Sequence, residues 1–487
     1  MSDDQFSVNI LTRKHISTVQ KSLKNAKSDI IGMAAKDARI KVTQFLSDNY
    51  QELLSGINED DIKKEKIKKI IQEYCADNGV NIGNLSLKDT VTELYQDIVE
   101  YSFLTELISE NSPVNYEEIR IDDYDDVRIV VSGKEYKYHR QFDSPEQLLT
   151  IAQKMCQNLN KDGGVIKEAN PFIRLRLGNH TRVSMMANPV ARRPNDTTNP
   201  VVQMTIRKQR KEPFSKEFLI SNGTFNQKGY NLILICLNGL VSMAFYGGTN
   251  SGKTAVMASV AQQIAQNNRT VSIAEIDEIN LRKVDSSGNC LNSSLMWEIK
   301  ENSGMTLEKL INSALTFTPE TIIIQEIKGP ETVDAINASI TGHQVLTSLH
   351  ADSKHVFGKR ILGMYKLSGS DLSDDLILDY VVDAFPVLVK MKIYPDRKRR
   401  VAEICELISY DRSKGAFETN VLYDFVVEDT INEDQYDEYL QEKVTSVWVK
   451  GYHRPVNKPS DKLIRMLLEG GISRSEIDCL LNDWGGD

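Results

Sequence analysis

A glycine-rich octapeptide in the middle of the chain most narrows the folds open to it. The octapeptide is Gly247-Gly248-Thr249-Asn250-Ser251-Gly252-Lys253-Thr254. An apolar run ending at Tyr246 precedes it, and a helix-forming run follows it. A buried strand that turns through such a loop into a helix aims backbone N–H groups and the helix dipole at one point. The pattern predicts an α/β sheet with an anion site at the edge of a central strand.

The spacing within the octapeptide is typical of a loop that holds a nucleoside triphosphate, a P-loop. In this interpretation the loop amides cradle the β-phosphate, Lys253 neutralises the β and γ oxygens, and the Thr254 hydroxyl binds Mg²⁺. Asn250 stands where many such loops have glycine, and asparagine is the other residue that best tolerates positive φ. We therefore expect ATP and Mg²⁺ as cofactors, with all eight residues as nucleotide ligands.

Two later strands are expected to bring carboxylates to the same edge of the sheet. The β-branched run 321–325 ends at Glu326, and the run 270–274 ends in an acidic cluster formed by Glu275, Asp277 and Glu278. A further strand is expected at 344–348, and this alternation of strands and helices predicts a parallel sheet with crossover helices. Attack by water needs a carboxylate base at that edge, and Glu278 is our choice. The alternative is a solvated acidic loop.

Composition and charge exclude several classes of protein. At 487 residues the chain is expected to form about three domains. A net charge of -9 argues against a protein that coats nucleic acid. The six cysteines are scattered without a zinc-like spacing, which predicts reduced core residues in the cytosol. The amino terminus is polar and acidic, without the features of a secretory signal.

The apolar run 232–246 is the best candidate for a membrane span, but it is shorter than the roughly 20 residues that a span needs. We expect a buried helix followed by a buried strand instead. From residue 14 onward the chain has the periodicity of helices. One is expected over 91–108, behind a Thr90-x-x-Glu93 capping box. Strands follow after Pro113, and the loop 192–196 is expected to be mobile.

The segment from Thr318 to Glu331, with its continuation through Thr341-Gly342-His343 to Thr347-Ser348-Leu349-His350, carries a resemblance to a known family. It resembles the type II/type IV secretion ATPase superfamily, and within it the CpaF-like branch that drives tight-adherence pilus assembly. Glu117-Glu118-Ile119, Thr205-Ile206-Arg207-Lys208 and Arg400-Val401-Ala402-Glu403-Ile404 resemble other motifs of that family. The resemblance covers about residues 95–470.

The resemblance implies roles for individual residues. Glu278 falls on the glutamate that acts as general base, and Glu326 on the acid that orients water or metal. His343 and His350 fall on a histidine motif that senses the γ-phosphate, and Lys253 keeps its phosphate role. The expected catalytic residues are therefore Glu278, Glu326, Lys253 and His343, with Thr254 and Glu326 at the metal. The resemblance also implies that Arg182 and Arg207 reach the phosphates from the amino-terminal domain, a task that suits permanently charged guanidinium groups; surface ion pairs are the alternative.

The sequence departs from the family's pattern at several positions near the site. These are Ala274 and Glu275 in place of a Glu-Asp pair, Gln325 in place of glycine, Lys328 in place of arginine, and Thr316 and Thr318 in place of arginines. The loss of positive charge bears on the turnover rate and on the coupling of subunits. Both key carboxylates and Lys253 are present, which favours an active enzyme.

The fold class implied is α/β: a RecA-like P-loop core, a small α+β amino-terminal domain and an amino-terminal helical appendage. The expected segments are the appendage at 1–108, the α+β domain at 109–207, a linker at 208–226, and the ATPase domain with a carboxy-terminal extension at 227–487. The implied function is a cytoplasmic, hexameric ATPase, peripheral at the membrane, that works on an inner-membrane platform protein and not on nucleic acid. A conjugation-type secretion ATPase and a nucleotide-gated scaffold with weak hydrolysis are the alternatives.

Overall fold

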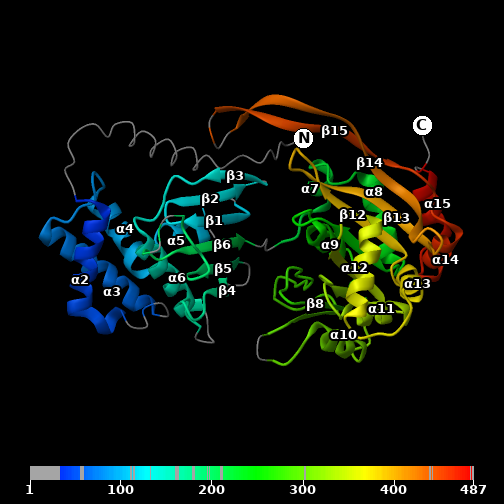
Figure 1. Ribbon diagram of the computed structural model, residues 1–487, viewed down its shortest axis with the longest axis horizontal. Coiled ribbons are helices and arrows are strands. Elements are labelled where there is room, and N and C mark those ends of the chain that lie inside the picture. Colours follow the sequence, from blue (N-terminus) through cyan, green and yellow to red (C-terminus); the bar gives the residue numbers. More distant parts are fainter. Residues whose placement is uncertain are drawn as a thin grey trace. The chain divides into compact units, whose positions relative to one another are not determined.

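The computed structural model describes residues 33–54, 57, 60–109, 112, 116–131, 133–159, 164–177, 181–194, 196, 198–208, 212–300, 303–437, 440, 442–482 and 484. The chain divides into two compact units, Met1–Gln209 and Arg210–Asp487, each described by itself (Figure 1). Residues 1–32 of the expected helical appendage and 209–211 of the expected linker lie outside the described residues. The finer domain boundaries stay predictions.

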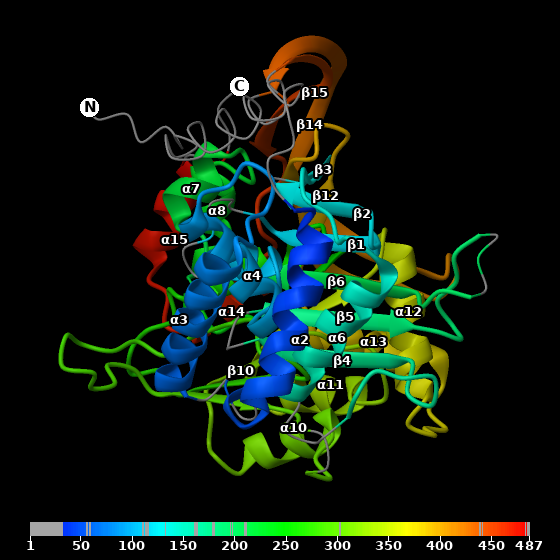
Figure 2. The same cartoon turned by 90° about the vertical axis from the view of Figure 1, so that its left-hand side faces the viewer.

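The first unit begins with a small helical bundle. Its helices are α2 (Ala35–Leu54), α3 (Asp61–Asn78), α4 (Leu87–Val99) and the short α5 (Leu104–Ile108). Figure 2 shows α2, α3 and α4 next to one another. Apolar side chains at helical spacing, among them Leu46, Ile67, Ile71 and Leu94, are fully buried between them. Burial of one stripe from each helix stabilises the bundle.

The helix expected over 91–108 is wrong at both ends. Helix α4 begins at Leu87, and its N-cap is Ser86, whose side chain accepts from the Asp89 amide. Thr90 lies inside the helix, where its buried hydroxyl donates to the Asn81 side chain. The chain breaks after Val99, and Ser102 has a φ of 57° before α5 begins. Thr90 therefore does not cap a helix as predicted, because its hydroxyl binds Asn81 and Ser86 is the N-cap.

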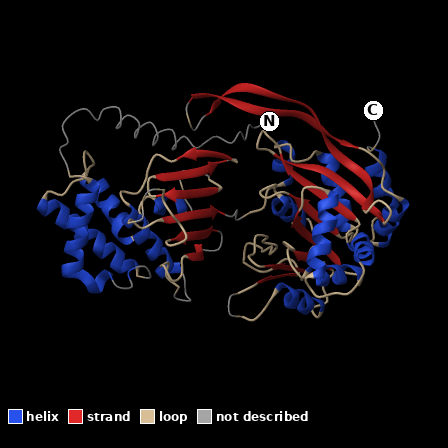
Figure 3. Ribbon diagram, in the orientation of Figure 1, coloured by secondary structure: helices blue, strands red, loops and turns tan. Residues whose placement is uncertain are grey.

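An antiparallel sheet completes the first unit. Its strands are β1 (Glu118–Asp123), β2 (Asp126–Val131), β3 (Lys134–Lys137), β4 (Phe172–Leu177), β5 (Thr181–Ala187) and β6 (Val202–Lys208), in the spatial order β3-β2-β1-β6-β5-β4. Figure 3 shows them side by side, and helix α6 (Pro145–Leu159) packs against β4 and β6. Alternate residues such as Ile119, Val183 and Ile206 are fully buried, so one face of the sheet forms a core.

Polar contacts join the bundle to the α+β part of this unit. The Lys154 ammonium on α6 donates to the carbonyl oxygens of Asp97 and Ile98, at the end of α4, at 2.9 and 2.7 Å. Burial lowers the pKa of Lys154 to about 8, and the Asp97 carboxylate opposes the shift. A cation at a helix carboxyl terminus is a favourable partner for the unpaired carbonyls. Arg39 adds an ion pair to Asp143 at 2.9 Å.

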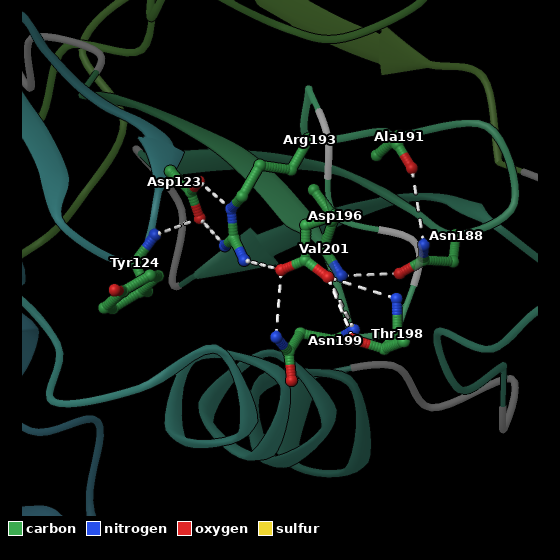
Figure 4. Close-up of polar contacts among 9 residues, drawn as sticks. All are labelled: Asp123, Tyr124, Asn188, Ala191, Arg193, Asp196, Thr198, Asn199 and Val201. Atoms are coloured by element: carbon green, nitrogen blue, oxygen red, sulfur yellow. Dashed lines mark hydrogen bonds and ion pairs between the residues drawn. The ribbon is translucent and has the colours of Figure 1, made fainter.

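The loop expected to be mobile is tied to the sheet. Arg193 forms ion pairs with Asp123, at the end of β1, and with Asp196. Asp196 in turn accepts from the backbone amides of Thr198 and Asn199 at 3.1 and 3.2 Å (Figure 4). These charge-assisted contacts close the loop on itself and on β1. Nothing in the local sequence distinguishes an arginine with such partners from a solvated one.

The second unit is built on a nine-stranded sheet in the spatial order β15-β14-β13-β12-β7-β11-β10-β8-β9. Six strands are parallel: β7 (Met243–Gly247), β8 (Thr270–Ala274), β9 (Ser294–Glu298), β10 (Thr321–Ile324), β11 (Gln344–His350) and β12 (Val387–Ile393). Its helices are α7 (Lys216–Ser221), α8 (Gln227–Asn238), α9 (Lys253–Ala261), α10 (Leu307–Leu315), α11 (Thr332–Ile340), α12 (Lys354–Lys366), α13 (Asp374–Ala384), α14 (Asp461–Glu469) and α15 (Arg474–Asn482). The predicted parallel α/β core is confirmed.

The run 232–246 is indeed the end of a buried helix followed by a buried strand, since α8 leads into β7 and every residue of β7 is buried. Strand β7 lies between β11 and β12 in the sheet, and because its successive side chains point to opposite faces, their burial shows that both faces are covered. In the described part of the chain, no helix combines the length and the apolar character that a membrane crossing requires.

An antiparallel extension of the sheet had no counterpart in the sequence-based predictions. It comprises β13 (Arg399–Asp411), β14 (Ala416–Asp437) and β15 (Glu442–Pro455). The pairing of β13 with β14 stops at Asp424, whereas β14 and β15 stay paired up to Asp437 and Glu442. The outer part of this hairpin forms the long orange arm in Figure 2. We call residues 425–452 the hairpin arm.

Part of the stretch expected as a linker is packed on the second unit. Within 208–226, Ser215 caps α7 by accepting from the Phe218 amide, and Leu219 and Phe225 are buried in the core of this unit. The cysteines also differ from expectation, since Cys290 and Cys479 are exposed and the other four are buried. Proline and charged residues in 208–226 suggested a boundary between domains, but apolar residues of this segment pack into the core of the second unit.

Substitution of Gly229 tests how closely α8 packs against the sheet. A Cβ at this position would lie 2.4 Å from the Tyr423 ring, which is fully buried and hydrogen-bonded through its hydroxyl to Asn226. Gly229→Ala should therefore lower the free energy of unfolding by about 1–3 kcal/mol through overpacking. Gly363→Ala is the matched control, because a Cβ there meets nothing within 4 Å. That variant should gain about 0.5–1 kcal/mol from helix propensity. Chemical denaturation of both variants checks this, and a stabilised Gly229→Ala would contradict the packing.

Candidate functional site

The octapeptide forms the turn between β7 and α9. Asn250 has a φ of 58° and Gly252 a φ of 91°, so both residues adopt the left-handed conformation. The prediction for Asn250 is confirmed. Gly247 has no room for a side chain, because a Cβ would lie 2.1 Å from the Met391 carbonyl oxygen on β12. The loop therefore fits closely against the neighbouring strand and opens at the amino end of α9.

Lys253, the first residue of α9, is only 6% exposed. Its ammonium donates to the carbonyl oxygens of Gly247 and Gly248 at 3.2 and 2.9 Å and lies 3.2 Å from His350 Nδ1. Burial lowers the pKa of Lys253 to about 8, and the Glu326 carboxylate opposes the shift. The loop thus holds a desolvated cation that lacks a carboxylate within ion-pair distance among the described residues.

His350 connects this cation to Glu326. It is the last residue of β11, next to Gly247 in the sheet register, and its Nε2 lies 3.1 Å from Glu326 Oε1. Burial and the charge of Lys253 lower the pKa of His350, so the imidazole is neutral at pH 7. A neutral Nδ1 can accept a hydrogen bond from the Lys253 ammonium, and the Glu326 carboxylate lies on the other side of the ring, beside Nε2.

Gln325 organises the acidic loop after β8. Its side-chain amide donates to Asp277 Oδ1 at 2.6 Å and to Ser272 Oγ at 3.1 Å. Its side-chain oxygen, Oε1, accepts from the backbone amide of Glu278 at 2.8 Å. All three contacts join β10 to the end of β8, and the Gln325 side chain is buried. The residue that departs from the family's glycine therefore fixes the backbone of the predicted general base.

The other departures have different surroundings. Lys328 forms an ion pair with Glu275, so the replacement of arginine by lysine kept a cation beside the acidic loop. Thr316 is the C-cap residue of α10, and Thr318 follows with a φ of 50°. Nothing in the structure explains an effect of these two threonines on the site. The carboxylates and Lys253 lie on loops at the carboxyl edge of the parallel strands, the edge where such sheets bind ligands.

His343 is not brought to this edge. It precedes β11, whereas His350 ends it, so the two histidines are separated by roughly 20 Å of extended chain. His343 Nδ1 lies 3.2 Å from the Ala338 carbonyl at the end of α11. Two histidines that flank one strand lie at its opposite ends. The motif alone did not reveal which of these ends forms the site. The predicted catalytic role of His343 has no support from the geometry within this unit.

Arg182 and Arg207 belong to the first unit. They are direct neighbours on β5 and β6, and Arg176 on β4 is the next residue in the same row. The row lies on the face of the sheet opposite the buried core residues. Glu118 on β1 is directly opposite Arg207, so the row combines three guanidinium groups with one carboxylate.

Three residues near the P-loop were not found from the sequence. Arg399 Nε donates to the Asn250 carbonyl oxygen at 2.8 Å. Asp352 Oδ1 lies 3.5 Å from the position of a Cβ on Gly248, and its charge acts on Lys253. Arg360 on α12 adds to the lowering of the pKa of His350. Arg399 adjoins the carboxy-terminal motif that begins at Arg400, but adjacency gave no sign of its contact.

Comparison with known proteins gives a family match over more than half of the chain. The family described as Type II/IV secretion system protein matches residues 113–374. An uncharacterized protein of Methanocaldococcus jannaschii is 26% identical over 326 residues, which cover 65% of this chain and 55% of that protein. The type IV secretion system protein VirB11 of Brucella abortus is 27% identical over 197 residues, or 39% of this chain and 54% of VirB11. The chain thus spans about half the length of these relatives.

Among solved structures, the ATPase DotB of Yersinia pseudotuberculosis matches with a TM-score of 0.46 and 15% sequence identity. The match covers 64% of this chain and 78% of the DotB chain.

The buried cation of Lys253 predicts a pH dependence. In the unfolded chain the lysine keeps its ordinary pKa of 10.5, whereas in the folded chain it is about 8. The folded state therefore binds fewer protons between these values, and its stability rises with pH in that window. The difference in unfolding free energy between wild type and Lys253→Met should change by on the order of 2 kcal/mol from pH 7 to pH 10 in favour of wild type.

Denaturant titrations at the two pH values measure this difference. Lys450→Met on the exposed hairpin arm is the matched control, since it removes an exposed ammonium whose partner at 3.8 Å, Glu428, is exposed as well. Equal pH profiles for wild type and Lys253→Met would show that the Lys253 ammonium is solvated in the folded protein.

Proposed function

This chain belongs to the type II/IV secretion system protein family, and from that premise we propose that it is a Mg²⁺-dependent ATPase. We propose further that it converts hydrolysis into mechanical work for the assembly of a pilus or secretion machine. One observation carries the proposal: Lys253 sits buried at the head of α9, beside a His350–Glu326 pair, in a loop with two left-handed residues. A cation with only neutral hydrogen-bond partners is suited to receive an anion.

Phosphate binding follows from the contacts of Lys253. Its present partners are two carbonyls and an imidazole, which are neutral. The β and γ oxygens of a triphosphate are charged acceptors and form stronger hydrogen bonds with an ammonium. ATP should therefore draw Lys253 away from His350 and the glycine carbonyls. His350 would then lose its contact with Lys253. Because His350 also lies beside Glu326, nucleotide binding would change the surroundings of Glu326.

The acidic loop provides the base for attack by water. Gln325 fixes the backbone of Glu278 beside the end of β8, and Asp277 is tied to the same amide group. A carboxylate held at this edge can accept the proton of a water molecule that lies against the γ-phosphate. Glu278 is proposed as this base, and Glu326 as the acid that orients water or metal. Gln325 stands where the family has glycine, and its hydrogen bonds to Glu278 and Asp277 hold the acidic loop and the proposed base in place.

The residues at the edge of the sheet fit a magnesium ion that is bound mainly by the nucleotide. In the described part of the chain, no group of three His, Cys, Asp or Glu side chains converges as a metal site. Magnesium in nucleotide sites takes one or two protein ligands and completes its shell with phosphate oxygens and water. The Thr254 hydroxyl in the first turn of α9, and Glu326, would hold it. When bound, the ion would neutralise charge on the phosphates.

The first unit is proposed to complete the nucleotide site. Arg182 and Arg207 lie side by side with Arg176, and guanidinium groups form bidentate, charge-assisted hydrogen bonds with phosphate oxygens.

The proposed assembly is a homo-hexameric ring at the cytoplasmic face of the membrane, where it acts on an inner-membrane platform protein. The tight-adherence branch of the family is the preferred placement, because the motifs at 318–353 resemble it. A conjugation-type secretion ATPase is the second candidate, and the 27% identity over 197 residues to VirB11, a type IV secretion system protein, supports a secretion role in general. The negative net charge of the chain speaks against direct work on nucleic acid in either role.

Two substitutions separate binding from chemistry. Lys253→Ala removes the cation that receives the phosphates, and the ATP affinity should fall at least about a hundredfold. Glu278→Gln keeps the loop but removes the base, so ATP should still bind while turnover falls by about 10²–10⁴. Calorimetry and phosphate release measure the two effects. Glu469→Gln, an exposed position on α14, should behave like wild type. Wild-type turnover by Glu278→Gln would move the base to another residue.

The ring predicts a nucleotide-dependent mass. Native mass spectrometry of the wild type with a non-hydrolysable ATP analogue and Mg²⁺ should show a species of about six chains, as expected for a closed cyclic assembly. Lys253→Ala should fail to gain this species on addition of the analogue. A monomer at all protein and nucleotide concentrations would refute the ring while leaving the nucleotide site intact.

A further inference from the structure

The P-loop is contacted by a residue almost 150 positions away in the chain. Arg399, the first residue of β13, donates from Nε to the Asn250 carbonyl oxygen at 2.8 Å. The Cδ of the same side chain lies 3.3 Å from the position that a Cβ on Gly252 would take. Arg399 therefore touches both left-handed residues of the loop.

The next residue anchors this contact. The Arg400 guanidinium forms a bidentate pair with Asp396 at 2.9 and 2.6 Å, and both side chains are almost fully buried. It also lies over the rings of Tyr394 and Phe425, at 5.2 and 4.9 Å from their centroids, and these two rings contact each other edge to face. Successive residues of a strand point to opposite faces, so a fixed Arg400 fixes the direction of Arg399. A bidentate pair together with packing against two aromatic rings leaves an arginine little freedom.

This anchor is part of the base of the hairpin arm. Phe425 belongs to β14, and the Val449 amide on β15 donates to Asp396. Lys398, in the same turn, lies over the Trp448 ring at 5.1 Å. The turn between β12 and β13 is thus held by both strands of the arm on one side and reaches the P-loop through Arg399 on the other.

We propose that Arg399 is a positioning residue that fixes the P-loop to the base of the hairpin arm. The proposal rests on the proposed function as far as the nucleotide is concerned, but the contact itself does not need ATP. A trans peptide is planar, so a fixed Asn250 carbonyl also fixes the direction of the Ser251 N–H. Arg399 holds that peptide plane from outside, and the Ser251 N–H donates to the Gly248 carbonyl oxygen at 3.4 Å, so the loop has an ordered conformation before the nucleotide arrives. A loop ordered in advance loses less entropy on binding.

Two substitutions separate a positioning role from direct contact with phosphate. Arg399→Gln places its amide nitrogen where the arginine has Nε, so the hydrogen bond to Asn250 is kept while the charge is lost. Arg399→Ala loses both. We expect the ATP dissociation constant to rise about tenfold in Arg399→Ala and to stay within about twofold of wild type in Arg399→Gln. Calorimetric titration with Mg²⁺ and ATP measures this. Arg465→Ala, which removes an exposed arginine from α14, is the control for charge and should bind like wild type.

Hydrogen exchange tests the same role without nucleotide. The peptide that covers 247–254 should exchange at least about fivefold faster in Arg399→Ala, and at the wild-type rate in Arg399→Gln, because a lost hydrogen bond raises local opening. On addition of ATP, the peptide that covers 445–453 should gain protection in wild type and in Arg399→Gln. In Arg399→Ala with saturating ATP, protection should be gained at the P-loop alone.

The outcomes separate this proposal from the proposed function. Equal losses of affinity in Arg399→Gln and Arg399→Ala would overturn it, since the charge would then act on the nucleotide directly. Unchanged exchange of the P-loop in Arg399→Ala would overturn it as well. A wild type that does not bind ATP, but whose P-loop loosens in Arg399→Ala, would refute the ATPase and support the positioning role.

Discussion

The site depends on the burial of one ammonium group. Lys253 is held in a place where water cannot solvate it, and the surrounding protein offers only neutral acceptors. A desolvated cation is costly unless its hydrogen bonds are satisfied, which requires both glycine carbonyls to face inward. That geometry exists because β7 is covered on both faces and Gly247 fits against β12 without a side chain. The P-loop is therefore as much a product of the sheet as of its own sequence.

The parallel sheet supplies the remaining polar groups by ending its strands at one edge. Strand β11 brings His350 beside Gly247, β10 brings Gln325 and Glu326, and β8 brings the acidic loop. Each group then contacts a neighbour from another strand: His350 contacts Lys253 and Glu326, and Gln325 contacts Asp277. This mutual support orients the side chains before any ligand binds. Such an arrangement lowers the reorganisation that a nucleotide would otherwise impose.

Outside the core, the same kinds of contact tie additions to each unit. The helical bundle of the first unit is fixed by Lys154, whose ammonium satisfies carbonyls at the end of α4. The antiparallel extension of the second unit is fixed by Arg400, which pairs with Asp396 and packs against two aromatic rings. Both cations have little contact with water and bind two or more acceptors, and removing one partner from such a group costs more than the contact contributes. Arg399, the residue before Arg400, joins the extension to the P-loop.

The sequence by itself determined the features that depend on neighbours along the chain. The octapeptide fixed the turn from β7 into α9 and the left-handed Asn250, and alternation of apolar runs fixed the strands at 270–274 and 321–324 and the parallel core. Tertiary structure decided what depends on distant partners. Thr90 became a core residue bound to Asn81, Gln325 became the organiser of the acidic loop, and Arg399 reached Asn250. The strand predicted at 344–348 already separated His343 from His350, and tertiary structure decided that only the end with His350 contacts Lys253. Local patterns encode dihedral angles and faces, whereas a hydrogen bond between residues far apart forms only once the sheet has set their strands side by side.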